Sequence, residues 1–247
     1  MVGTHRPIVT HGWLEYLPNN KAEWLGKAYV LLEDDASHQL MAVAAQVALA
    51  NVVAGLESGI TIFVKDNIEV VGLPATAGSL ALTGRPVKSD AKLVSSLKSA
   101  GAIILGSTNL SEWANIRSNK STSGWSAVGG LTANPWSYKH SAGGSSSGSG
   151  AAVAAGLIPA AIGTETDGSI VCPAALNGVV GIKPTVGRIS TAGVIPISFS
   201  QDSPGPLARN VTDASKVLGV LLGESNFLKK FKPLFRNKYF VAFTATS

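Results

Sequence analysis

A single glycine, Gly101, separates a helical pattern from a strand pattern, and this joint strongly constrains the fold. Residues 89–100 carry leucine and valine at helical spacing, and residues 102–105 (A-I-I-L) form an apolar run typical of a buried strand. An earlier apolar run, residues 60–64 (I-T-I-F-V), is rich in β-branched residues and also predicts a strand. A helix joined to a strand in this way is half of a βαβ unit and indicates an α/β protein.

Local signals refine this helix and its joint. Ser89 is placed to cap the helix N-terminus, and Asp90 would lie in the first turn, where a carboxylate is favourable. Gly101 is the residue expected just beyond the last turn. Lys65 follows the first strand directly, so we expect it where the core meets a cleft.

Residues 141–150 (S-A-G-G-S-S-S-G-S-G) have the composition of a flexible linker. Their context argues against that role. A helical run, 151–155, continues them and ends at Gly156, and residues 157–162 then form a short apolar element. We therefore expect the glycine-rich run to lie inside one folded core.

Composition excludes several classes of protein. The chain has 247 residues, of which 45% are hydrophobic and 14% charged, with a net charge of +5. This describes a globular protein with a sizeable core. Its basic residues are mostly dispersed, so no nucleic-acid partner is expected. The longest apolar run, residues 40–56, is interrupted by polar residues and is read as a buried helix, not a membrane span. A single cysteine, Cys172, and an N-terminus without an apolar signal segment favour a cytoplasmic location.

Several familiar catalytic motifs do not fit this sequence, because the order or spacing of their residues differs. Residues 144–148 fit G-x-S-x-G, but all four histidines precede Ser146, whereas the α/β-hydrolase order places the histidine last. The glycine-rich run lacks the lysine of a phosphate-binding loop, and no histidine lies near Glu165 and Asp167 to suggest a metal site. A lysine base remains possible, because burial lowers the pKa of a lysine by penalising its charged form. Lys65 suits that role, although an ordinary surface or salt-bridged lysine would fit the same position.

Several segments, read together, closely resemble the amidase signature family. They are G-G-S-S-S-G (143–148), G-T-E-T-D-G-S-I (163–170), V-K-D-N (64–67), G-I-K-P-T (181–185), D-S-P-G-P (202–206), T-N-L-S-E (108–112) and N-P-W (134–136). The resemblance implies an amidase signature fold, with a central mixed β-sheet covered by helices on both faces. It extends from about residue 59 to residue 222, so the fold would be incomplete at its C-terminal side.

The resemblance also implies roles for individual residues. Ser169 would be the nucleophile, Ser145 the middle member of the triad after a cis peptide bond, and Lys65 the base. A hydroxyl both donates and accepts, so Ser145 could pass a proton between the other two. The remaining implied residues are an oxyanion hole from the backbone N–H groups of Thr166, Asp167, Gly168 and Ser169, and a supporting loop of Gly143, Gly144 and Ser146.

The implied reaction is hydrolysis of a small-molecule or peptide amide through an acyl-enzyme, without metal or organic cofactor. Asp167 and Val171 stand where the common family form has glycine and arginine, and Glu165 replaces an aspartate, which is more similar to stand-alone and peptide amidases. We divide the chain into a lead-in (1–58), a signature core (59–223) and a basic, aromatic tail (224–247). Two alternatives stay open: an A-type component of a tRNA-dependent amidotransferase, and a truncated protein that no longer catalyses.

Overall fold

The computed structural model of the chain describes residues 60–224. The predicted helix at 40–56, the lead-in and nearly all of the basic, aromatic tail lie outside these residues. The division of the chain at residues 58 and 223 therefore stays a prediction. None of the helices within residues 60–224 is long and apolar enough to cross a bilayer.

A five-stranded mixed sheet forms the centre of the described fold, with the strand order β2-β1-β5-β7-β6. Strand β1 pairs in parallel with β2 and β5, whereas β7 runs antiparallel to β5 and β6. The bounds of its strands are Thr61–Lys65 (β1), Ile103–Thr108 (β2), Ala160–Glu165 (β5), Val180–Gly181 (β6) and Ser203–Ala208 (β7). A separate two-stranded sheet joins Trp125–Ser126 (β3) and Gly130–Leu131 (β4).

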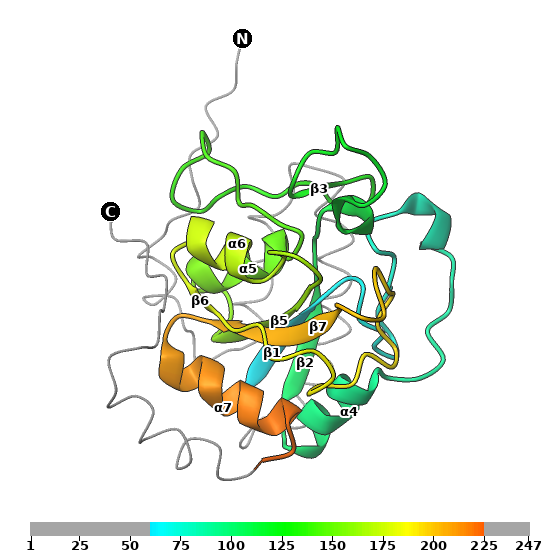
Figure 1. The fold of residues 1–247 in the computed structure, drawn as a ribbon, viewed down its shortest axis with the longest axis vertical. Coiled ribbons are helices and arrows are strands. Elements are labelled where there is room, and N and C mark those ends of the chain that lie inside the picture. The colour runs from blue at the N-terminus through cyan, green and yellow to red at the C-terminus, as the bar shows by residue number, and fades with distance from the viewer. Residues whose placement is uncertain (1–59, 225–247) are drawn as a thin grey trace, which may run out of the picture.

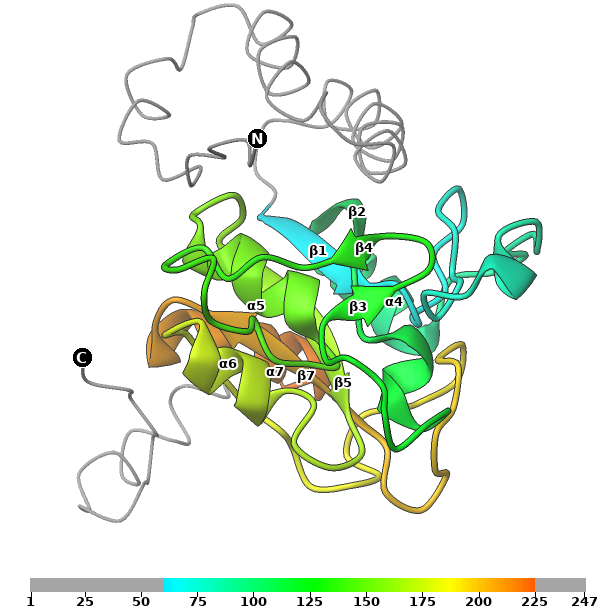
Figure 2. The ribbon, with the colours of Figure 1, turned by 90° about the horizontal axis from the view of Figure 1, so that it is seen from above.

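Helices cover both faces of this sheet, as expected (Figure 1). Helices α4 (Lys92–Ser99) and α7 (Val211–Leu221) lie on one face, and α5 (Ser147–Ala154) and α6 (Val171–Leu176) lie on the other (Figures 1 and 2). Two short 3-10 helices, Leu80–Leu82 and Glu112–Asn115, lie in the connections. The architecture is that of an α/β protein with a mixed sheet between helical layers.

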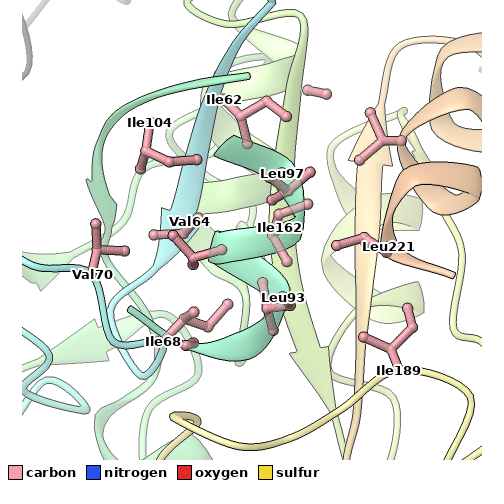
Figure 3. Close-up of a cluster of buried hydrophobic side chains, with 14 of the residues drawn as sticks. Ile62, Val64, Ile68, Val70, Leu93, Leu97, Ile104, Ile162, Ile189 and Leu221 are labelled. Atoms are coloured by element: carbon pink, nitrogen blue, oxygen red, sulfur yellow. The ribbon is translucent and has the colours of Figure 1, made fainter. Parts of the chain in front are cut away.

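The larger hydrophobic core fills the space between the sheet and helices α4 and α7. Figure 3 shows Leu93 and Leu97 of α4 beside Ile62 and Val64 of β1 and Ile162 of β5. Each of these five side chains is almost completely buried. Fully burying a side chain of this size stabilises the fold by about 1.5–3 kcal/mol. The apolar stripe predicted for residues 89–100 is thus the buried face of α4.

The structure corrects the start of this helix. Helix α4 begins at Lys92, and its N-cap is Ala91, so Ser89 is not the cap. Asp90 lies before the helix, where its carboxylate accepts a hydrogen bond from the backbone N–H of Val71 and pairs with Lys98. The predicted end is confirmed, because Gly101 follows the last turn with a positive φ of 86° that glycine adopts readily.

Two further elements differ in their bounds from the runs seen in the sequence. Helix α5 begins at Ser147, within the glycine-rich run and four residues before the helical run that starts at residue 151. Strand β5 occupies Ala160–Glu165, so it includes the end of the apolar element at residues 157–162 and extends three residues beyond it. In both cases packing against neighbouring strands decides the bounds, since β5 lies between β1 and β7 and all six of its residues are buried. The run nevertheless lies inside a folded core, as predicted.

Candidate active site

The carboxyl ends of two parallel strands bring distant segments together. Strand β1 ends at Lys65 and its parallel neighbour β5 ends at Glu165, with Val64 paired to Ile162. Parallel strands end at the same edge of a sheet, where α/β proteins commonly bind ligands. The loop that precedes α5 reaches this edge and adds Ser145 and Ser146.

Lys65 is fully buried, with an exposed fraction of 0%. Its Nζ lies 2.6 Å from Ser145 Oγ, 2.9 Å from Thr164 Oγ1 and 3.1 Å from the backbone oxygen of Thr164. Three acceptors therefore surround a nitrogen that carries three hydrogens when charged and two when neutral. The site can satisfy either protonation state.

Burial also makes the neutral state of Lys65 accessible near neutral pH. Desolvation lowers the pKa of Lys65 from 10.5 to about 7, because burial penalises the ammonium form. Asp202 and Glu165 act in the opposite direction, since their negative charges favour the ammonium ion. Desolvation is the larger effect, so Lys65 can serve as a proton acceptor at ordinary pH.

Ser145 lies in a loop that hydrogen bonds hold against other segments of the chain. The peptide bond between Gly144 and Ser145 is cis. The carbonyl of Ser145 accepts a hydrogen bond from the backbone N–H of Ser111 at 3.0 Å. Ser146 Oγ donates to the backbone oxygen of Thr164 at 3.2 Å and accepts from its N–H at 3.3 Å. These contacts place the Ser145 hydroxyl against Lys65.

The absence of a side chain at Gly163 allows this close approach. A Cβ atom at position 163 would lie 2.6 Å from Ser146 Oγ, a separation that real Cβ atoms essentially never show. The loop could not then rest on β5 at this point. Glycine is therefore required by packing here, not by an unusual backbone angle.

Ser169 lies in the turn that follows β5, next to the same loop. The backbone N–H of Ser146 donates to the carbonyl of Ser169 at 3.1 Å, and Gly168 has a positive φ of 78°. Glu165 secures the far side of the turn, because its Oε2 accepts from the N–H groups of Ile170 and Val171 at 2.7 and 2.9 Å. Among residues 60–224, no hydrogen bond joins the hydroxyls of Ser169 and Ser145.

The residues predicted to form the oxyanion hole lie in the same turn. The N–H groups of residues 166–169 form no hydrogen bond within the described part of the chain. Thr166 Oγ1 donates to Asp202 at 2.6 Å, which anchors this side chain, whereas the Asp167 side chain is exposed. An oxyanion hole requires backbone donors without protein partners, and this role of residues 166–169 stays a prediction. His, Cys, Asp and Glu side chains of residues 60–224 form no group of three that could hold a metal ion.

The structure thus joins Lys65 to Ser145 directly, and Ser145 to Ser169 through the adjoining backbone. Their catalytic roles stay predictions. Sequence reasoning assigned no role to three residues of the site: Thr164, Asn67 and Asp202. All three lie inside motifs that carried the family resemblance, which was their one sequence signal. Thr164 is 99 residues from Lys65 and 97 residues from Asn67 in the chain, so no local sequence pattern shows these contacts.

Comparisons with known proteins show what this chain is similar to. A family profile described as Amidase matches residues 19–247. A probable amidase of Arabidopsis thaliana is 49% identical over 166 residues, which make up 67% of this chain and 32% of that protein. The A-type component of the glutamyl-tRNA(Gln) amidotransferase of Methanosarcina acetivorans is 42% identical over 218 residues, or 87% of this chain and 42% of that protein.

Solved structures show the same likeness. The native peptide amidase of Stenotrophomonas maltophilia superposes with a TM-score of 0.67 at 50% sequence identity, covering 82% of this chain and 45% of that one. The chain therefore spans less than half the length of each of these three proteins.

Proposed function

Because the chain belongs to the amidase family, we propose that it hydrolyses the carbon–nitrogen bond of a carboxamide. The observation that carries this proposal is the 2.6 Å contact between Lys65 Nζ and Ser145 Oγ at a fully buried position. A lysine paired with a serine in this way can act as a base, because its pKa is lowered to about 7. Ser169 is the proposed nucleophile.

The first half of the reaction forms a tetrahedral intermediate on Ser169, whose collapse then gives the acyl-enzyme. Neutral Lys65 accepts the proton of Ser145, and Ser145 accepts the proton of Ser169. Ser169 Oγ then forms a bond to the amide carbon, and the carbonyl oxygen becomes an oxyanion that the N–H groups of residues 166–169 stabilise. Removing one such donor from an oxyanion hole typically costs about 3–4 kcal/mol of transition-state stabilisation.

The second half releases both products. The carbon–nitrogen bond breaks as the proton held on Lys65 returns through Ser145 to the leaving nitrogen, which departs as ammonia or an amine. Water then attacks the Ser169 ester, and the same two residues take its proton. The ester bond breaks, Ser169 regains its proton and the carboxylic acid leaves. Every step uses side chains and backbone of this chain.

The proposed substrates are small-molecule amides or peptide amides. The likeness to the peptide amidase of Stenotrophomonas maltophilia favours the second class. Glu165, Asp167 and Val171, which depart from the common family form, lie in and beside the turn that would hold the scissile amide. The buried acid Glu165 supports the turn, whereas the other two side chains are exposed beside it.

Covalent labelling tests the proposal directly. The full chain is treated with a fluorophosphonate, and the modified residue is identified by peptide mass spectrometry, alongside release of ammonia from a panel of amides. We expect labelling at Ser169 that Ser169→Ala abolishes and Lys65→Ala slows strongly. Ser215→Ala is a matched control, because Ser215 is a buried serine of α7 on the other face of the sheet. Labelling that persists in Ser169→Ala would remove Ser169 as the nucleophile.

Two other functions are distinguished by the same assays. An A-type component of an amidotransferase is the alternative that the Methanosarcina acetivorans relative favours. That function predicts activity that depends on glutamine and on a partner protein. In contrast, a protein that no longer catalyses would fold but neither react at Ser169 nor release ammonia.

A further inference from the structure

We propose that Thr164 and Asn67 are positioning residues that hold Lys65 so that its lone pair faces Ser145. This inference rests on the proposed function, because it concerns how the base is oriented for the relay. Thr164 lies on β5 and Asn67 follows β1, and both are buried, with exposed fractions of 6% and 3%. Neither side chain would contact the substrate carbonyl in the proposed reaction.

The hydrogens on Lys65 Nζ determine which way its lone pair points. A neutral amine has two N–H hydrogens and one lone pair, and a proton relay requires the lone pair to face Ser145 Oγ. Both hydrogens then need other acceptors. Thr164 supplies both: its backbone oxygen at 3.1 Å, which can only accept, and its Oγ1 at 2.9 Å. One residue therefore takes the two hydrogens and leaves the lone pair for Ser145.

The same contacts serve the charged state. When Lys65 becomes an ammonium ion, its third hydrogen points to Ser145 Oγ at 2.6 Å, and the two contacts with Thr164 remain. The nitrogen can thus gain and lose a proton without moving. Hydrogen bonds to charged groups are the stronger ones, so Thr164 Oγ1 stabilises the ammonium form more than the amine.

Asn67 restrains the Thr164 side chain. Asn67 Nδ2 donates to the same Thr164 Oγ1 at 3.0 Å, and the backbone oxygen of Asn67 accepts from Ile195 at 2.8 Å. The residue is thereby anchored through its backbone, and its side-chain amide holds the threonine rotamer. A free rotation of Thr164 would carry Oγ1 away from Lys65.

A cost to stability accompanies this arrangement. Asn67 Oδ1 is buried and has no hydrogen-bond partner within the described residues. A buried polar atom without a partner is unfavourable and rare in native proteins, so it requires an explanation. An apolar side chain of similar size would avoid this cost but could not hold Thr164. The unpartnered oxygen is therefore consistent with a residue retained for positioning.

Kinetics of Thr164→Val and Thr164→Ser in the full chain test the proposal. Valine keeps the shape but removes Oγ1, and we expect kcat to fall about tenfold or more with little change in KM, since general base catalysis contributes about 10²–10⁴-fold. The acid limb of the pH profile of kcat/KM should move to lower pH, because the ammonium form loses an acceptor. Serine restores Oγ1 and should restore most of kcat and the position of the limb.

The Asn67→Leu variant tests the proposal independently. It should lower kcat, while the melting temperature stays close to that of the wild type because an unpartnered oxygen is removed together with a hydrogen bond. Combining Asn67→Leu with Thr164→Val should lower kcat no further than Thr164→Val alone, since both act through one atom.

The matched control is Thr108→Val. Thr108 is a buried threonine beside Lys65 in the β1–β2 register, but its hydroxyl contacts Ser149 and Val64 instead. Thr108→Val should therefore not shift the acid limb of the pH profile of kcat/KM. The inference is overturned if Thr164→Val keeps the wild-type kcat and pH limb, or if Thr108→Val moves the limb equally. If the wild type neither hydrolyses amides nor reacts at Ser169, the proposed function fails first, and this inference falls with it.

Discussion

The Nζ of Lys65 and the Oγ of Ser145 lie 2.6 Å apart, although 80 residues separate them in the chain. Lys65 ends β1, and Ser145 lies in the loop before α5. The contact is buried. Because the pKa of Lys65 is lowered to about 7, the fraction of Lys65 that is neutral and can accept a proton changes with pH near neutrality. This pair and the groups around it are therefore open to tests by substitution and by pH.

Replacing Asp202 by asparagine should move the acid limb of activity to lower pH. Asp202 is buried, and its negative charge raises the pKa of Lys65, opposing the larger effect of desolvation. Without that charge the pKa of Lys65 falls further below its wild-type value of about 7. The measurement is the pH profile of kcat/KM for Asp202→Asn and for the control Asp213→Asn, at a partly exposed aspartate of α7. An unchanged or raised limb in Asp202→Asn would contradict the electrostatic argument.

Lys65 should make stability rise with pH on the alkaline side. Its pKa is about 7 in the folded chain and 10.5 in the unfolded chain, so the unfolded chain binds more protons between these values. The contribution of Lys65 to the free energy of unfolding should therefore increase from about pH 7 to pH 10.5. This contribution should be lowest below pH 7. At about 1.4 kcal/mol per pKa unit the change is on the order of 5 kcal/mol.

Urea denaturation of wild type and Lys65→Met across this pH range measures the effect. Methionine is similar in shape and does not titrate, so the difference between the two proteins isolates Lys65. We expect that difference to change steadily between pH 7 and pH 10.5. Parallel curves over the whole range would show that Lys65 titrates equally in both states.

Asp66 should act in a separate, acidic window. Burial raises the pKa of Asp66 from 3.8 to about 6, although hydrogen bonds from the hydroxyl and backbone N–H of Thr76 favour its charged form. The folded chain holds this proton longer than the unfolded chain. The contribution of Asp66 to stability is therefore greatest below pH 4 and is lost as pH rises to about 6.

Asp66→Asn removes the titration and should flatten that part of the stability curve. Denaturation at intervals between pH 4 and pH 7 checks this, with Asp213→Asn as a control at a partly exposed aspartate. The two windows do not overlap, so Asp66→Asn should leave the rise above pH 7 intact. A steeper fall in the variant than in wild type would contradict the assignment.

Gly148→Ala should destabilise the fold by about 1–3 kcal/mol, which is typical of overpacking. A Cβ at position 148 would lie 2.7 Å from both the backbone nitrogen and the backbone oxygen of Asn109, and backbone cannot move aside cheaply. Gly84→Ala is the control, because nothing lies within 4 Å of a Cβ there and φ is not positive. Gly84→Ala should leave stability unchanged or raise it by about 0.4–1 kcal/mol. Thermal unfolding distinguishes the pair, and equal melting temperatures would refute the prediction.

Elements with a strong periodic pattern could be predicted from the sequence. The stripe of α4 and the glycine that ends it were confirmed, and β1 begins and ends within one residue of its expected bounds. The N-cap at Ser89 was wrong because Asp90 forms contacts with Val71 and Lys98 that no local pattern contains. Helix α5 begins early because its small residues pack against β2 and β5, and packing outweighs their low helix propensity.

Membership of the family and the residues that carry it were readable along the chain, since each motif is a contiguous run with its own spacing. The class of fold followed from the same kind of local information. What the tertiary structure alone decided is which atoms meet: Thr164 Oγ1 between Lys65 and Asn67, and Asp202 close enough to act on Lys65. The lowered pKa of Lys65 is also a consequence of the tertiary structure. It arises from removing an amine from water, and that burial exists only once β1, β5 and the loop before α5 are packed together.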